Sequence, residues 1–240
     1  NERILVNFVM RNKIINDPSG ASMQYAPSDG LPKLREQIAN LMTLDGTPCE
    51  AQDVLILQGS QQGIDLAAKM FIDPGDVLIT EDPTFLGALI AFNLNQPNYK
   101  AIPMDDDGMR TDLLKEVLEA NPRTKMIYTI PDFQNPTGVT LSLARRKELI
   151  NLANIHDVVI LEDTPYRHIR FEGENLPTLK SMDTQNRVIH LGSFSKILVP
   201  GLRIGWAIAE TSLIQKLGLL KVAADTQTST LNMSATSLFL

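Results

Sequence analysis

The sequence predicts an α/β domain in which a mostly parallel β-sheet lies between helices. Short apolar and β-branched runs, such as 77–80, alternate with longer segments of helical spacing, such as 111–120. This alternation is typical of strand–helix–strand units, which give parallel sheets covered by helices on both faces. A second observation is that the residues with reactive side chains follow runs expected to be strands. Ligands bind at the carboxyl ends of such strands, so these residues are expected to meet at one edge.

The expected elements follow in chain order. Strands are expected at 54–57, 77–80, 99–104, 125–130, 158–161, 188–191 and 203–209. Helices are expected from 59 to about 71 and at 86–93, 111–120, 143–155 and 212–224. In the helix at 111–120, for example, Leu114, Val117 and Leu118 recur at the spacing that places apolar side chains on one face.

The two ends of the chain differ from this alternating region. Residues 1–25 lack the pattern and are expected to lie outside the sheet, which leaves 26–240 as one domain. The first residue is Asn1, and Leu240 falls within an apolar stretch of helical character. Both ends are therefore expected to be cut from a longer product.

The composition narrows the class of protein. Hydrophobic residues make up 43% and charged residues 21% of the 240 residues, which is ordinary for a soluble globular protein. The net charge of −6 argues against nucleic acid as the main partner, and no apolar run approaches the ~18 residues of a membrane span. Cys49 is the single cysteine, so no disulfide forms within one chain and a reducing compartment, the cytoplasm, is expected.

Two segments carry groups that could bind an anion. Ser193, Ser195 and Lys196 follow the strand expected at 188–191, and Arg203 lies seven residues beyond the lysine. Two hydroxyls and a planar guanidinium could hold a phosphate. Ser60 opens a helix, whose free backbone N–H groups and dipole also favour an anion. Taken alone, each pattern also fits a solvated lysine or an ordinary helix start.

Two further segments place polar groups after strands. Glu162 and Asp163 end the strand expected at 158–161, and a buried acid there must be paired or take part in chemistry. Strand alternation turns only one of the two toward a given face, and the sequence does not say which. The prolines and glycine of 131–138 predict a rigid turn that would hold the amide of Asn135.

Together these motifs resemble the aminotransferase class I/II family of enzymes that use pyridoxal 5'-phosphate (PLP). The resemblance covers about residues 25–232 and is carried by Asn135-Pro136-Thr137-Gly138, Asp163-x-x-Tyr166, and Ser193-x-Ser195-Lys196 with Arg203. The phrases at 133–135 and 191–196 look most like the 2-aminoadipate (LysN-like) and MocR-type branch. The resemblance implies the large domain of the fold-type I PLP-dependent transferases, with the C-terminal small domain largely absent from this chain.

The resemblance also implies roles for individual residues. Lys196 would form the Schiff base with PLP and move the proton between the substrate Cα and the cofactor C4'. Asp163 would pair with the pyridine nitrogen and so preserve the electron sink. Asn135 and Tyr166 would donate to the ring oxygen, and Phe85 would stack on the ring where relatives often carry tyrosine.

The remaining implied contacts concern the phosphate and the assembly. The residues expected around the phosphate are Ser60, Gln61, Ser193, Ser195 and Arg203. Tyr25 looks like the tyrosine that reaches the phosphate of a neighbouring subunit. A homodimer with shared active sites is therefore expected.

The function implied is a PLP-dependent aminotransferase (EC 2.6.1.-) that moves an amino group between an α-amino acid and a 2-oxo acid. Two alternatives on the same scaffold are an effector-sensing domain of a MocR-type transcription regulator and a PLP-dependent lyase. The three histidines, His156, His168 and His190, lack the spacing of metal ligands, so no metal is expected. The sequence does not name the amino-acid substrate.

Overall fold

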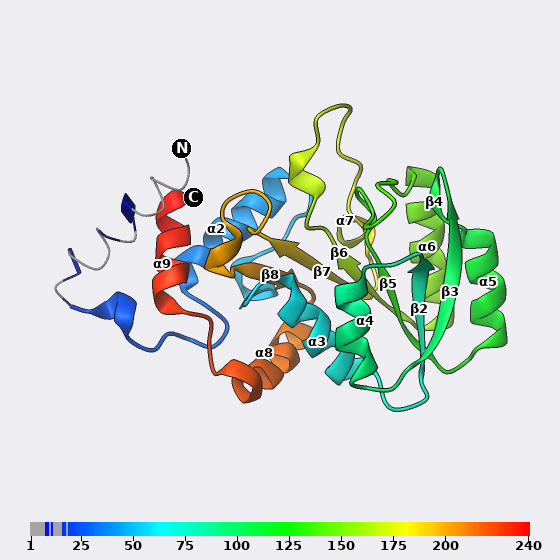
Figure 1. Cartoon of the computed structure of the whole chain (residues 1–240), viewed down its shortest axis with the longest axis horizontal. Helices are drawn as coiled ribbons and strands as arrows, with labels where there is room; N and C mark the ends of the chain where they lie inside the picture. Colours follow the sequence, from blue (N-terminus) through cyan, green and yellow to red (C-terminus); the bar gives the residue numbers. More distant parts are fainter. Residues whose placement is uncertain (1–7, 10, 12–15, 18) are drawn as a thin grey trace.

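The computed structural model describes residues 8, 9, 11, 16, 17 and 19–240. In this part of the chain, eight strands form one sheet in the order β1-β8-β7-β6-β5-β2-β3-β4 (Figure 1). The strands are β1 (Val54–Leu57), β2 (Val77–Asp82), β3 (Asn98–Asp105), β4 (Gly108–Met109), β5 (Thr124–Thr129), β6 (Val159–Asp163), β7 (Val188–Ser193) and β8 (Gly205–Ile208).

The helices follow the strands as expected, with several additions. The α-helices are α2 (Pro32–Leu44), α3 (Ser60–Phe71), α4 (Leu86–Asn93), α5 (Thr111–Ala120), α6 (Leu143–His156), α7 (Leu179–Met182), α8 (Thr211–Asp225) and α9 (Thr230–Phe239). Short 3₁₀ turns are η1 (Ala21–Met23), η2 (Ala51–Asp53), η3 (Arg167–Ile169) and η4 (Pro200–Leu202). None of the helices in the described residues is long and apolar enough to cross a membrane.

The sheet is mostly parallel, as the sequence predicted. Strands β3, β2, β5, β6 and β7 are parallel to their neighbours in that order. Strand β8 is antiparallel to both β7 and β1, so β1 points the same way as β7. The two-residue strand β4 is antiparallel to β3.

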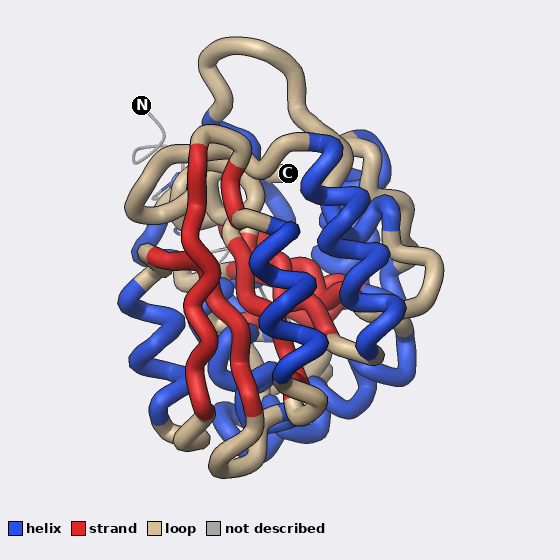
Figure 2. The backbone as a smooth tube through the Cα atoms, turned by 90° about the vertical axis from the view of Figure 1, so that its right-hand side faces the viewer, coloured by secondary structure: helices blue, strands red, loops and turns tan. Residues whose placement is uncertain are grey.

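Helices cover both faces of the sheet (Figure 2). In β1, Leu55 and Leu57 pack in the cluster formed with α3, α4 and α8, whereas Val54 and Ile56 pack in the cluster formed with α2 and α9. A third cluster joins α5, α6 and α7 to the alternate residues of the central strands, such as Ile160. Because both faces are buried, the strands read as nearly continuous apolar runs.

The carboxyl ends of β1, β2, β5, β6 and β7 meet at one edge, and this edge also receives the start of β8. The expectation of a strand at 203–209 was therefore partly wrong. Arg203 lies before β8 in a left-handed conformation, with φ of 52°, that ends η4. Since β8 runs against its neighbours, the residue that precedes it reaches the same edge as the residues that follow the parallel strands.

The expectation for residues 1–25 concerns, in part, residues outside the described ones. Of the described residues in that range, Ala21–Met23 form η1 and none belongs to a strand. The hydroxyl of Thr230 donates to the carbonyl of Gln24 at 2.7 Å, which ties this segment to α9.

Candidate active site

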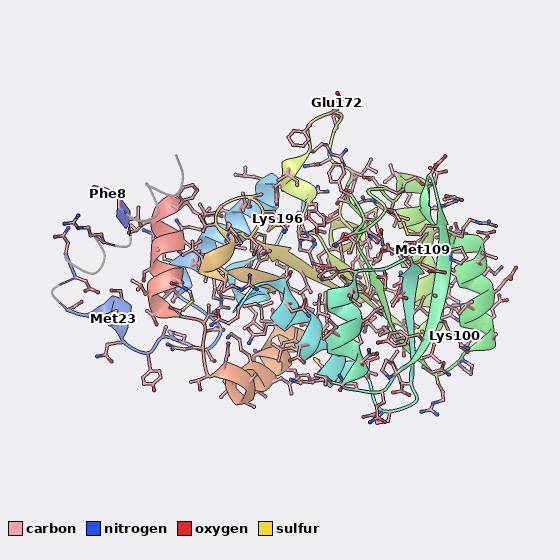
Figure 3. All side chains as sticks on the ribbon, in the orientation of Figure 1. Phe8, Met23, Lys100, Met109, Glu172 and Lys196 are labelled. Atoms are coloured by element: carbon pink, nitrogen blue, oxygen red, sulfur yellow. The ribbon has the colours of Figure 1, made fainter. Side chains whose placement is uncertain are left out.

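A cavity of about 370 Å³ opens at the carboxyl edge of the sheet. It is lined by Ser60, Gln61, Phe85, Ile130, Asn135, Asp163, Pro165, Tyr166, Ser193, Ser195, Lys196, Pro200 and Arg203. Every residue that the sequence predicted for the site lines this cavity, except Tyr25. In the view of Figure 3, Lys196 appears near the middle of the molecule, below the loop that carries Glu172.

One end of the cavity is rich in hydrogen-bond donors. The guanidinium of Arg203 donates to the hydroxyl of Ser195 and to the carbonyl of Gln58, both at 3.3 Å. Helix α3 begins at Ser60 with no side chain capping it. Its first backbone N–H groups are therefore free to donate, and together with the positive end of the helix dipole they would stabilise an anion at this end of the helix.

Glycine is required where two strands meet this corner. A Cβ on Gly205 would lie 2.7 Å from the backbone nitrogen of Ser60 and 2.9 Å from the carbonyl oxygen of Gly192. Backbone atoms cannot move aside as a flexible side chain does. The absence of a side chain therefore lets the start of α3 lie directly against β8.

Asp163 presents to the cavity a buried carboxylate with one free oxygen. Its Oδ2 accepts a hydrogen bond from the hydroxyl of Tyr128 at 3.0 Å, whereas Oδ1 has no partner among the described residues. Tyr128 is fixed by an edge-on contact with Phe92, with ring centroids 5.4 Å apart. Burial raises the pKa of Asp163 to about 6. A cationic N–H group placed against Oδ1 would satisfy it.

Neighbouring residues of β6 take opposite roles, which the sequence had left open. Glu162 faces away from the cavity and accepts from the Nδ1 atom of His190 at 2.9 Å and from the backbone N–H of Leu179 at 2.7 Å. His190, at the facing position of β7, is fully buried, as expected for a core histidine. Asp163 is thus the acid that serves the cavity.

Three further groups line the cavity. The amide of Asn135 donates to the hydroxyl of Tyr166 at 3.2 Å, so two hydrogen-bonding groups from different loops meet. The Nζ atom of Lys196 lies 5.8 Å from the centroid of the Tyr166 ring. No described residue forms a hydrogen bond or ion pair with this amine, which leaves it available for a reaction.

Tyr25 lies apart from the cavity. Its side chain is 85% exposed, and it is absent from the residues that line the site. A role for Tyr25 in this site therefore requires a second copy of the chain.

Sequence reasoning missed the buried polar residues behind the cavity. The carboxylate of Glu81 accepts from the hydroxyl of Thr129 and from the amide of Gln134, the latter at 3.0 Å. Gln134 in turn accepts from the backbone N–H of Thr137 at 3.0 Å and so fixes the turn around Asn135. An acid near the end of an apolar strand is a signal that could have identified Glu81, as it did Asp163.

Glu81 is expected to make stability depend on pH. Burial raises its pKa to about 7 from the ordinary 4.5. Between these values the unfolded chain loses the proton and the folded chain keeps it, so the free energy of unfolding falls as pH rises. The loss attributable to Glu81 is complete above the folded pKa and amounts to roughly 3 kcal/mol.

The substitution Glu81→Gln removes the titrating carboxyl group and, with it, this pH dependence of stability. Relative to the parent, the variant is expected to gain roughly 2–3 kcal/mol in free energy of unfolding when urea titrations at about pH 8 are compared with those at about pH 5. Comparing two pH values cancels any hydrogen bond that the amide changes equally at both. Glu172→Gln, at an exposed position, is the control. A difference that does not vary with pH would assign the pH dependence to other groups.

The comparisons with known proteins agree with this geometry. The family model described as "Aminotransferase class I and II" matches residues 5–238. The aromatic-amino-acid aminotransferase 1 of Thermococcus litoralis is 42% identical over 223 residues, 91% of this chain and 54% of that protein. An uncharacterized HTH-type transcriptional regulator of Bacillus subtilis, YisV, is 32% identical over 91% of this chain and 45% of that protein.

A solved structure gives the same result. It is LysN, the α-aminoadipate aminotransferase of Thermus thermophilus, complexed with N-(5'-phosphopyridoxyl)-L-leucine. The TM-score is 0.92 and the identity 35%, over 99% of this chain and 60% of that one. The predicted fold-type I architecture and the 2-aminoadipate and MocR-type branch are thus confirmed. The chain spans about half the length of the curated relatives it matches. It belongs to the aminotransferase class I and II family.

Proposed function

We propose that this chain supplies the cofactor-binding domain, residues 26–240, of a PLP-dependent aminotransferase that exchanges an amino group between an α-amino acid and a 2-oxo acid. The observation that carries the proposal is one cavity with an anion-binding corner, a buried carboxylate with an unpaired oxygen, and a free amine. The group that clamps the substrate carboxylate is expected in the length of the relatives that this chain does not span. The lone cysteine favours a cytoplasmic location.

The residues of the cavity fit both ends of the PLP cofactor, its phosphate and its ring nitrogen. Its phosphate matches the donors of Ser60, Gln61, Ser193, Ser195 and Arg203. Its protonated ring nitrogen matches the orphaned Oδ1 of Asp163, since a buried carboxylate oxygen requires a donor. When bound, PLP withdraws electrons from the Cα of the substrate, which makes loss of a proton there easier.

The chain's own groups hold the cofactor and move the proton. Lys196 would hold PLP covalently through its amine and, once released by the substrate, would carry the proton to and from the substrate Cα. Asn135 and Tyr166 would donate to the ring oxygen. Phe85, which lines the same cavity, would cover one face of the ring.

The two alternatives have less support. A lyase and an effector-sensing domain would use the same cofactor pocket, so the pocket alone does not separate them from an aminotransferase. The relative with the highest identity given above is named as an aminotransferase, whereas the regulator is 32% identical. Transamination is therefore the function that we propose.

Lys196→Ala is expected to abolish both covalent attachment of PLP and transfer of an amino group to 2-oxoglutarate in the full-length protein. Lys196 is the only amine that lines the cavity among the described residues, so none of these can replace it. Borohydride reduction of the PLP-loaded protein followed by peptide mapping locates the attachment. Lys69→Ala, which removes a lysine paired with Asp65 on α3, is the matched control. Label on Lys69, or a full rate in Lys196→Ala, would show the assignment to be wrong.

Asp163→Asn is expected to leave PLP binding largely intact while slowing proton removal from the substrate by about 100-fold or more. The phosphate contacts remain, but the neutral amide no longer favours a protonated ring nitrogen. Single-turnover absorbance measurements with a saturating amino acid give the rate. Asp76→Asn is the control, because Asp76 is also buried but pairs with Arg123 before β2 begins. A normal rate in Asp163→Asn would contradict the pairing.

A homodimer with shared sites is part of the proposal. Leu86 and Ile90 on α4 and Leu94, which caps its end, lie four residues apart and are 67%, 61% and 72% exposed. This apolar row begins directly after Phe85, which lines the cavity. Together with the exposed Tyr25, it supports a second copy packing beside the cavity, since contiguous apolar surface favours association.

Mixed dimers distinguish a Tyr25 that acts across the interface from one that acts within its own chain. Tyr25→Ala and Lys196→Ala subunits are each expected to be weakly active or inactive. When they are unfolded together and refolded, half of the dimers are hybrids with one complete site, so roughly a quarter of the parent activity should return. Recovery is absent if Tyr25 serves its own subunit. A mixture of Asp163→Asn and Lys196→Ala subunits, which cannot complement, is the control.

A further inference from the structure

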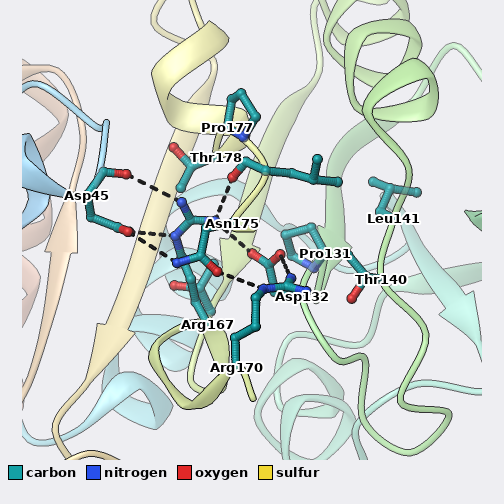
Figure 4. A network of polar contacts seen from close by, with 12 residues as sticks. Asp45, Pro131, Asp132, Thr140, Leu141, Arg167, Arg170, Asn175, Pro177 and Thr178 are labelled. Carbon is teal, nitrogen blue, oxygen red and sulfur yellow. Dashed lines mark hydrogen bonds and ion pairs between the residues drawn. The ribbon is translucent and has the colours of Figure 1, made fainter. Parts of the chain in front are cut away.

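Figure 4 shows a cluster of charged side chains that includes Asp132, Arg167 and Arg170. None of these residues lines the cavity. The centre of the cluster is Asp132, which is fully buried. One carboxylate oxygen accepts from Arg146 at 2.7 Å and lies 3.7 Å from Arg170. The other accepts from Arg167 at 3.3 Å. Asp132 therefore joins three guanidinium groups from two segments of the chain.

Arg146 fixes Asp132 to helix α6. The Arg146 side chain is fully buried and also donates to the carbonyl oxygens of Pro131 at 2.8 Å, Leu141 at 2.9 Å and Pro177 at 3.0 Å. Its donors are thus used to bind the start and the end of the loop that contains Asn135. The loop is anchored to α6 on the side away from the cavity.

Arg167 connects the same carboxylate to helix α2. It is 1% exposed, donates to the carbonyl of Leu176 at 2.7 Å and pairs with Asp45, which caps the end of α2. Asp45 also lies within 3.5 Å of the amide of Asn175. The arginine that follows Tyr166 is thus held from two sides.

The cluster joins the bases of the two loops whose tips form a pair in the cavity. Asp132 lies three residues before Asn135, and Arg167 directly follows Tyr166. Between Asp132 and Asn135, Phe133 has φ of 52°, a conformation that a bulky residue adopts only when surrounding contacts hold it. Arg170 stacks over the Phe133 ring at 4.5 Å. The Asp132 ion pairs therefore fix both the spacing of the loops and the strained turn.

We propose that Asp132 and Arg167 are positioning residues, whose buried ion pair sets the distance between Asn135 and Tyr166 and thereby the hydrogen bonds they offer to the ring oxygen of PLP. This rests on the proposed function, because the ring oxygen belongs to the proposed cofactor. Removing one charge from such a cluster leaves its partners buried and unpaired, so the loops are expected to shift to find water or new partners.

The test measures the absorbance of the bound cofactor as a function of pH, not the rate of the reaction. Donors to the ring oxygen stabilise its anionic form, so weaker donation moves the pH midpoint of the visible absorbance of the PLP-loaded protein upward. Asp132→Asn in the full-length protein is expected to raise that midpoint by about one pH unit, the effect of one hydrogen bond to a charged group. In a background that lacks both donors, Asn135→Ala with Tyr166→Phe, the same substitution should shift it by less than about 0.3 pH units, because neither group that it positions can still donate.

Two further variants keep the outcome decisive. Arg167→Lys retains the charge but loses the planar guanidinium, so a smaller upward shift of the absorbance midpoint is expected. This variant provides the test if Asp132→Asn does not fold. Asp183→Asn is the matched control: its carboxylate is also fully buried and accepts from the backbone N–H of Val188 at 3.0 Å, at the start of β7. It should lower the unfolding midpoint without moving the absorbance titration.

The results separate this proposal from the proposed function. A shift in Asp132→Asn or Arg167→Lys that vanishes in the background lacking both the Asn135 and the Tyr166 donor supports the positioning role. Variants that only unfold more easily, as Asp183→Asn does, overturn it while leaving the cofactor assignment intact. If the parent protein shows no PLP absorbance, the proposed function fails, and this proposal fails with it.

Discussion

The unpaired oxygen of Asp163 is the constraint on which the arrangement of the cavity depends. A buried carboxylate is unfavourable unless its oxygens find donors, and the described residues supply only the hydroxyl of Tyr128. The core around it is built to hold that geometry: Phe92 packs against Tyr128, and the preceding residue, Glu162, is satisfied separately by His190. The fold thus stabilises one acid fully and leaves its neighbour one donor short, toward the cavity.

The antiparallel direction of β8 determines where Arg203 lies. The groups at the anion-binding corner come from the end of β1, the end of β7 and the approach to β8. Only a strand that runs against its neighbours can bring the residue before it, Arg203, to the edge where the others finish. The close approach at Gly205 then seats the start of α3 against this corner.

The sequence predicted the fold class, most strand positions and the cavity-lining residues, because strand ends in a parallel sheet share one edge. It misassigned Arg203, because the apolar run that follows Arg203 reads as a strand from its first residue. It did not reveal Glu81 or Asp132 as the centres of buried networks. Their partners, Gln134 and Arg167, lie 53 and 35 residues away, and single-sequence patterns report only near neighbours.

The pairing of β1 has a consequence for how the chain acquires its fold. In the described sheet β1 is an edge strand whose single neighbour is β8, and Val54 pairs with Ile208. On a ribosome, which releases the N-terminal part first, β1 therefore waits until nearly the whole described chain has emerged before its ladder can form. Contacts between residues so far apart in sequence form slowly, because the chain loses the entropy of the intervening loop before the strand pairing stabilises the structure. The corner built from β1, β7 and β8 is accordingly a late product of synthesis, whereas β5 and β6 can pair while translation continues.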